Sequence, residues 1–141
     1  MDVVVRRLYG SDLNQQFLDT LSSLAEVKLT PDRAKEVFRE RLRRGIRSYV
    51  ACIGNRVVGT ASLLVEEKFI HGGGFSSHIE DVAVHKDFQK QGIGAALVGH
   101  LLQQARRLGC YKVILNCREG NAPFYGKMGF RRHDVGMRLD L

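Results

Sequence analysis

The chain has 141 residues, of which 44% are hydrophobic and 26% charged, and its formal net charge is +7. This length and apolar content predict a single domain, residues 1–141, with an ordinary hydrophobic core. The apolar runs are far shorter than the roughly 20 residues that cross a bilayer, and MDVVVRRLYG contains no signal-peptide core. We therefore expect a cytoplasmic protein without a membrane partner, with an organelle left open.

The basic charge favours an anionic partner, which could be nucleic acid, acidic lipid or a phosphorylated small molecule. Much of the charge lies between Arg39 and Arg47, where no aromatic residue is interleaved to stack on bases. We therefore expect no nucleic-acid partner. Cys52, Cys110 and Cys117 form neither a CxxC pair nor a zinc spacing, so we expect reduced, buried thiols and no metal.

The first third of the chain predicts a strand and two helices. Residues 2–8 are short and β-branched, which favours a strand. Ser11 predicts the cap of a first helix, and Thr30 followed by Pro31 predicts the start of a second. The expected buried positions of the two helices are Leu13, Phe17, Leu21 and Leu24, and Ala34, Val37, Phe38 and Leu42.

The middle of the chain predicts a β-hairpin followed by a third strand. Gly54 and Asn55 separate the apolar segments 47–53 and 56–67, and this dipeptide suits a two-residue turn. Residues 71–77 contain three consecutive glycines and predict a loop. Residues 78–85 then predict a strand.

The last third predicts a long helix between two strands. From Gly92 to Gly109, apolar residues recur every three or four positions, at Ile93, Leu97, Leu101, Ala105 and Leu108. Residues 111–117 predict a buried strand, 121–128 a short helix or turn, and 137–141 a final strand. The order βααβββαβαβ predicts a mixed α/β (α+β) fold.

The glycine turn Gln89-Lys-Gln-Gly92-Ile-Gly94 leads directly into the long helix. A strand, a glycine turn and a helix start form an anion site, because free backbone amides and the helix dipole converge there. The Walker pattern GxxxxGK[ST] is absent, and a GxGxxG fingerprint would need a small residue where Leu97 stands. The turn therefore predicts phosphate binding of another kind.

Gln89, Gly92 and Gly94 fit the Q/R-x-x-G-x-G/A signature of the GNAT N-acetyltransferase superfamily, which the chain resembles. Val82-Ala83-Val84 occupies the preceding strand, and Asn121 to Phe130 resembles the superfamily's N-x-x-x-FYxKxGF motif. The resemblance implies a mixed central sheet flanked by helices and acetyl-CoA as co-substrate. It also implies the cofactor-binding residues Val82, Ala83, Val84, Gln89, Lys90, Gln91, Gly92, Ile93, Gly94, Ala95, Asn121 and Tyr125.

Acetyl transfer to an amine needs a proton acceptor for the amine and a donor for the departing thiolate. Glu80 and Asp81 lie on the strand that would pass the thioester, and Tyr125 would face the sulfur. Neighbouring side chains on a strand point to opposite faces, so only one carboxylate can enter the substrate pocket unless a bulge turns the other. The sequence does not choose between them.

The segments 78–84, 109–117 and 124–130 resemble the glucosamine-6-phosphate N-acetyltransferase family. This resemblance implies acetylation of D-glucosamine 6-phosphate in UDP-N-acetylglucosamine biosynthesis, by a homodimer whose last strand crosses to the partner. Tyr111 and Lys112 would come from the partner subunit. The implied substrate-binding residues are Lys68, Phe69, Ile70, His71, Glu80, Asp81, Val82, Tyr111, Lys112 and Arg131.

The chain departs from that family at Asn116, where the family usually has aspartate. Asn116 can orient the amine but cannot act as a base, which leaves deprotonation to Glu80, Asp81, water or a backbone carbonyl. No cysteine is placed as an acyl carrier, so we expect direct attack in a ternary complex. The alternatives are acetylation of another small amine or a protein amine and, from a different class, a basic nucleic-acid-binding module.

Overall fold

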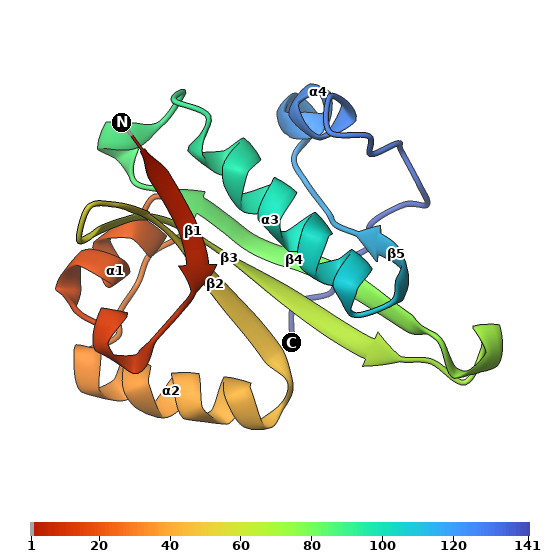
Figure 1. The fold of residues 1–141 in the computed structure, drawn as a ribbon, viewed down its shortest axis with the longest axis horizontal. Helices are drawn as coiled ribbons and strands as arrows, with labels where there is room; N and C mark the ends of the chain where they lie inside the picture. Colours follow the sequence, from red (N-terminus) through yellow and green to blue (C-terminus); the bar gives the residue numbers. More distant parts are fainter. Residues whose placement is uncertain (1) are drawn as a thin grey trace.

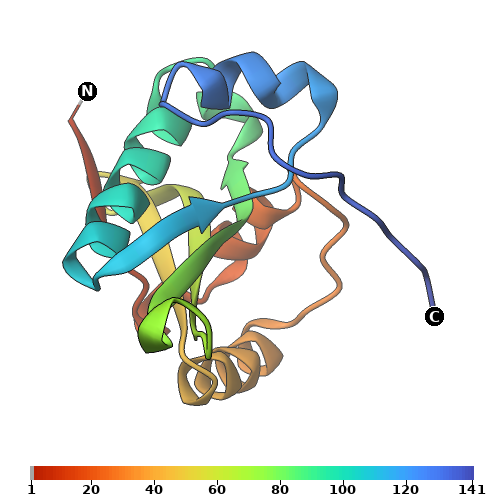
Figure 2. The same cartoon turned by 90° about the vertical axis from the view of Figure 1, so that its right-hand side faces the viewer.

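The computed structural model describes residues 2–141 and shows a five-stranded sheet with helices on both faces (Figures 1 and 2). The strands lie in the order β1-β2-β3-β4-β5, antiparallel except for the parallel pair β4 and β5. They are β1 (Val3–Arg7), β2 (Ile46–Ile53), β3 (Arg56–Glu67), β4 (Phe75–Val84) and β5 (Cys110–Ile114). The helices are α1 (Gln15–Leu21), α2 (Pro31–Arg43), α3 (Ile93–Arg107) and α4 (Ala122–Gly126). The predicted mixed α/β class is confirmed.

The sheet separates two hydrophobic cores because side chains alternate along its strands. Tyr49 and Leu63 point toward α3 and pack with its buried face. Val50, the neighbour of Tyr49, packs instead with Phe17 and Leu18 of α1. The sheet is therefore covered on both faces, with α3 on one side and α1 and α2 on the other (Figure 1).

The two N-terminal helices begin with side-chain caps. Asn14 accepts a hydrogen bond from the Phe17 amide at 3.1 Å, so Asn14 caps α1 and the prediction of Ser11 was wrong. Thr30 caps α2 as predicted, through a 3.2 Å bond from the Arg33 amide. Leu24 lies beyond the end of α1 and is exposed, because the helix ends at Leu21.

The predicted hairpin is confirmed: Gly54 and Asn55 connect β2 to β3, and Gly54 has a φ of 59°. The predicted loop over 71–77 is only partly right. Residues His71–Gly73 form a short 3-10 turn, and β4 already begins at Phe75 because this residue pairs with Glu67 of β3.

The long helix is confirmed as α3, which ends at Arg107, and Gly109, two residues later, has a left-handed φ of 77°. Its buried face includes four of the five predicted residues. Leu108 is half-buried because the helix has ended, and Val98 is buried in addition. The face fits closely against β3 and β4, as the packing at Gly59 illustrates.

Helix α2 buries less of its predicted face than expected. Ala34 is buried, whereas Val37 and Phe38 are half-buried and Leu42 is exposed. The physical reason is a cavity between α2 and the sheet, into which Val37 and Phe38 project. The amphipathic pattern predicted the direction of this face correctly but not how tightly the face is packed.

The final strand predicted at 137–141 is wrong for this structure. Residues 131–141 have no regular secondary structure and are exposed, and the segment extends away from the body of the protein (Figure 2). A strand needs a neighbouring backbone for its hydrogen bonds. No strand pairs with this segment within residues 2–141.

Gly59 permits the close approach of α3 to β3. A Cβ at Gly59 would lie 2.9 Å from Leu97 Cδ1 and 3.3 Å from the Ala83 carbonyl oxygen. We expect Gly59→Ala to lower the free energy of unfolding by about 1–3 kcal/mol through overpacking. Urea unfolding measures the change.

The matched control is Gly99→Ala, in the middle of α3, where an added Cβ meets no atom within 4 Å. This substitution should raise stability by roughly 0.5–1 kcal/mol, because glycine is a poor helix former. Changes of equal sign at the two positions would contradict the packing argument.

Candidate active site

The parallel strands β4 and β5 stay together for only part of their length. Their pairing runs from Phe75 with Cys110 to His78 with Ile114, where β5 ends. Beyond that point the chain after β5 turns away from β4 (Figure 2). Residues 79–84 are therefore bonded to β3 on one edge, and no strand among residues 2–141 covers the other edge. An extended ligand can add to an edge of this kind.

A β-bulge lies in the middle of β4. Glu80 pairs with Ser62 and Ala83 pairs with Thr60, so Asp81 and Val82 together oppose a single residue, Ala61. Asp81 has a φ of 53°, which is unusual for a residue other than glycine. The bulge shifts the alternation of side chains along the strand.

Both candidate carboxylates lie on the face of α1 and α2. Glu80 shares a face with Ser62, since paired residues project to the same side, and Asp81 lines the same cavity as Ser62. Glu80 Oε1 also lies 3.1 Å from His78 Nε2, two residues earlier. Val82 turns to the opposite face and packs against the α3 core. The sequence did not indicate which of Glu80 and Asp81 faces the substrate side, and in the structure both lie on the same face of the sheet.

The glycine turn forms the start of α3. Lys90 and Gly92 have left-handed φ values of 63° and 81°, which bend the chain sharply before the helix. The first helical hydrogen bond runs from the Ala96 amide to the Gly92 carbonyl oxygen at 3.0 Å. The amides before Ala96 thus lack acceptors within the helix and can bind an anion. Gln89 donates a 3.1 Å bond to the Val84 carbonyl oxygen and so ties the turn to β4.

Helix α4 packs against this turn through an aromatic pair. A Cβ at Gly94 would lie 3.5 Å from Phe124 Cζ and 3.9 Å from Val84 Cγ2, so α3, α4 and β4 meet there. The Tyr125 ring stacks on Phe124 with centroids 4.9 Å apart and an interplanar angle of 7°. Asn121, exposed, precedes the first residue of α4.

Burial raises the pKa of the Tyr125 phenol above its usual value, and the nearby Cys117 adds to the shift. The phenol therefore stays protonated at neutral pH and can donate a proton. The Phe130 ring packs edge-on against the Tyr125 ring, with the two centroids 5.8 Å apart. The aromatic neighbours thus hold the ring in place, while burial moves the pKa of the phenol further above neutral pH.

Asn116 lies two residues after β5 and is exposed. A Cβ at Gly136 would be 3.2 Å from Asn116 Nδ2, so the C-terminal segment passes beside the amide. Cys117 is exposed and Cys110 half-buried, and only Cys52 has the burial expected from the sequence. The three thiols are free.

Most of the predicted substrate-binding residues lie around the tip of the hairpin between β3 and β4, away from Glu80 and Asp81. The His71 and Tyr111 rings lie 4.2 Å apart, and Lys112 Nζ lies 5.6 Å from the Tyr111 ring. Lys68 donates a 2.6 Å bond to Glu66, which raises the pKa of the lysine. Phe69 and Ile70 are exposed beside them.

The hairpin tip lies far from the carboxylates in the same chain. Glu80 lies five positions along β4 from Phe75, at the tip, which corresponds to about 17 Å of strand. This span exceeds the length of a hexosamine phosphate. Arg131 is exposed at the start of the C-terminal segment, next to Arg132, which pairs with Glu119. The predicted substrate residues therefore lie in three places, at the hairpin tip, around the bulge of β4 and, for Arg131, at the start of the C-terminal segment.

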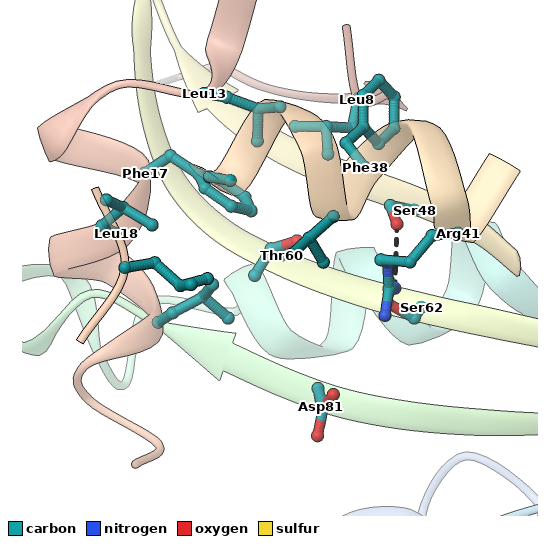
Figure 3. Close-up of a pocket in the computed structure, with 14 residues that line it drawn as sticks. Leu8, Leu13, Phe17, Leu18, Phe38, Arg41, Ser48, Thr60, Ser62 and Asp81 are labelled. Carbon is teal, nitrogen blue, oxygen red and sulfur yellow. Dashed lines mark hydrogen bonds between the residues drawn. The ribbon is translucent and has the colours of Figure 1, made fainter. Parts of the chain in front are cut away.

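A cavity of about 210 Å³ adjoins Asp81 on the face of α1 and α2 (Figure 3). Its walls are mostly apolar side chains, from α1, α2 and the segments that precede them, and its polar wall includes Thr60, Ser62 and Arg41. The sequence did not single out Arg41, because alternating arginines and glutamates on a helix are typical of a solvated face. The hydroxyls at Ser48 and Ser62, in otherwise apolar strands, were the available signal.

Other features of the described residues bear on the alternatives. Among residues 2–141, no helix is long and apolar enough to cross a membrane, and no cluster of His, Cys, Asp and Glu could hold a metal ion. The basic side chains of α2 are partly neutralised, since Arg33 pairs with Glu36 and both Arg43 and Arg44 pair with Glu40. This pairing weakens the case for a nucleic-acid surface on α2.

Comparisons with solved structures agree with the fold. The crystal structure of a Trypanosoma brucei acetyltransferase superposes with a TM-score of 0.92 at 42% identity, covering 99% of this chain and 100% of that chain. A glucosamine-6-phosphate N-acetyltransferase from Arabidopsis thaliana also gives 0.92, at 29% identity, and covers 99% of each chain. The described part of the chain therefore adopts the architecture of these acetyltransferases.

Sequence comparisons cover the same region. A glucosamine 6-phosphate N-acetyltransferase of Trypanosoma brucei brucei is 42% identical, over 100% of this chain and 97% of the relative. A relative of the same name from Dictyostelium discoideum is 31% identical, over 96% and 89%. Residues 13–130 match the family described as "Acetyltransferase (GNAT) family". The chain therefore belongs to the GNAT acetyltransferase family.

Proposed function

We propose that this protein transfers the acetyl group of acetyl-CoA to the amine of D-glucosamine 6-phosphate, giving N-acetyl-D-glucosamine 6-phosphate and CoA. The observation that carries the proposal is the open edge of β4, which ends at an anion-binding helix start and has Glu80 and Asp81 beside it. The names of the full-length relatives support the acceptor.

The open edge and the glycine turn suit the two parts of acetyl-CoA. The backbone of Val82 to Val84 would pair with the pantetheine amides, as a strand edge pairs with a peptide. The amides from Lys90 to Ala95 would bind the pyrophosphate, with Asn121 as a further contact. Gln89 would act indirectly, because its side-chain amide already binds the Val84 carbonyl oxygen. Acetyl-CoA supplies the acetyl group as an activated thioester.

The carboxylates on the face of α1 and α2 would receive the acceptor. Glu80 and Asp81 would bind its ammonium group and accept a proton from it, directly or through water. Asn116 would orient the amine without acting as a base. The amine nitrogen would then attack the thioester carbon, the carbon–sulfur bond would break, and Tyr125 would donate its proton to the departing thiolate. The second proton that the nitrogen loses would return through water to Tyr125.

We also propose that the active unit is a homodimer. Because the hairpin tip lies about 17 Å along β4 from Glu80, one chain cannot use both groups on one sugar phosphate. The partner subunit's Tyr111 and Lys112 would supply the donors for the phosphate, which prefers lysine and arginine. The exposed apolar residues of the C-terminal segment alternate at Val135, Met137, Leu139 and Leu141, as in a strand that lacks its neighbour.

The test is release of free thiol from acetyl-CoA with four acceptors: glucosamine 6-phosphate, glucosamine, spermidine and a peptide amine. We expect kcat/KM for the phosphorylated sugar to exceed that for glucosamine by at least a hundredfold, because the phosphate adds charge-assisted contacts. A preference for spermidine or the peptide would contradict the acceptor while keeping the acetyltransferase chemistry. A ping-pong rate pattern would contradict direct transfer.

A further inference from the structure

Arg41 differs from the neighbouring arginines of α2 in where its side chain points. Arg43 and Arg44 are exposed and pair with Glu40. Arg41 instead reaches the sheet, where Nη2 donates to Ser62 Oγ at 2.6 Å and to Ser48 Oγ at 3.0 Å (Figure 3). Two hydroxyls from adjacent strands thus hold one guanidinium in place.

The held guanidinium lies across the cavity from Asp81. Both residues line the cavity, and Ser62 pairs in register with Glu80, the residue before Asp81. Burial lowers the pKa of Arg41, and the Asp81 carboxylate counteracts that effect. Arginine nonetheless remains charged in proteins, so the guanidinium needs an opposite charge. The two hydroxyls are neutral, and Asp81 is the carboxylate among the residues that line the cavity.

The backbone conformation of Asp81 must be held by its surroundings. Its φ of 53° belongs to the left-handed region, which a residue other than glycine occupies at a cost. Such a conformation persists when the surrounding structure holds it. The bulge alone does not decide where the carboxylate points, since Asp81 is exposed. An opposite charge in the cavity would draw it toward the face of α1 and α2.

We propose that Arg41 is a positioning residue, which holds the Asp81 carboxylate on the acceptor side of the sheet through its charge. Ser48 and Ser62 fix the guanidinium, and the guanidinium orients Asp81. The assignment of Asp81 to the acceptor amine rests on the function proposed above. The orientation of Asp81 by Arg41 is a separate statement about the fold, and it can be tested without turnover.

The kinetic test compares Arg41→Gln, Asp81→Asn and the double variant with the wild type, using glucosamine 6-phosphate. We expect Arg41→Gln to lower kcat at least tenfold and to change the KM for acetyl-CoA less than twofold. Because Arg41 acts through Asp81, adding Arg41→Gln to Asp81→Asn should cost less than a further twofold. Arg41→Lys should restore part of the loss, since it keeps the charge but not the planar fork.

The matched control is Arg43→Gln, on the same helix, which should leave kcat unchanged. Equal losses from Arg41→Gln in the wild-type and Asp81→Asn backgrounds would overturn the proposal, because they would show independent roles. An unchanged kcat in Arg41→Gln would overturn it as well. Where Arg41→Gln fails to fold, Arg41→Lys carries the same double-variant comparison.

A crystal structure separates this inference from the proposed function. If the wild type does not acetylate glucosamine 6-phosphate, the proposed acceptor is wrong, and the structure of the Arg41→Lys or Arg41→Gln variant still tests the positioning. We expect the Asp81 carboxylate to leave the cavity in Arg41→Gln and to stay in Arg41→Lys. A carboxylate that keeps its position in Arg41→Gln would overturn the inference.

Discussion

Tyr125→Phe should lower kcat by about a hundredfold, at the lower end of the range for loss of a general acid. A phenol with the usual pKa of about 10 is already protonated at neutral pH, and burial raises the pKa of Tyr125 further, so it is available as a proton donor. The ring itself should stay in place, since phenylalanine preserves the contacts with Phe124 and Phe130. The measurement is the initial rate of thiol release at saturating substrates.

The pH dependence gives a second view of the same residue. The Tyr125 phenol donates a proton only while it is protonated, and its pKa is raised. The rate of the wild type should therefore fall through deprotonation of Tyr125 only at alkaline pH, above the usual phenol pKa of about 10. Tyr9→Phe is the control, because Tyr9 is exposed beside Arg6 and should not affect kcat. A Tyr125→Phe rate within twofold of wild type would remove the proton-donor role.

Replacing Met137 and Leu139 together by aspartate should convert the proposed dimer to monomers and lower activity more than tenfold. Both side chains are exposed in the isolated chain, by 89% and 83%, and would lie on the same side of the segment once it pairs as a strand. A charge at these positions would oppose burial against a partner. Light scattering after gel filtration measures the mass, and thiol release measures the activity.

Arg138→Gln is the matched control for that double variant. Arg138 lies between the two apolar residues and therefore on the opposite side of the segment, where it binds Asp140 at 2.8 Å. We expect it to preserve the dimer and the rate. A wild-type protein that is monomeric and fully active would refute the shared site, as would a double variant that remains a dimer.

Much of the fold was predictable because its signals are local. The Gly54-Asn55 dipeptide suits the turn between β2 and β3, and the spacing of Leu97 and Leu101 matches the buried face of α3. These patterns depend on residues a few positions apart. They can therefore be recognised without knowledge of the rest of the chain.

The failed predictions depended on distant parts of the molecule. Ser11 and Asn14 are both good cap residues, and the 3-10 turn at Gly10–Asp12 places Asn14 at the helix start. The apolar face of α2 meets a cavity, which periodicity does not reveal. The segment 137–141 has the pattern of a strand, but a strand forms only where another edge accepts it.

The candidate site also combines features that local sequence predicts with features that depend on distant parts of the chain. The glycine turn could be recognised because Gln89, Gly92 and Gly94 lie within six positions of one another. The bulge at Asp81 depends on the register between β3 and β4, and the position of Arg41 depends on how α2 crosses the sheet. Neither arrangement leaves a pattern within a short window. The sequence therefore identified the two carboxylates but did not predict that they lie on the same face of the sheet.

The open edge of β4 has a further consequence for the exchange of amide hydrogens with solvent. Between residues 79 and 84, amides that face β3 are held in a ladder, while those that face the open edge meet water. The strand should thus exchange its hydrogens at two rates in alternation, although it is a single element. An extended ligand bound along that edge would slow the fast set alone and so mark, residue by residue, the length of strand that it occupies.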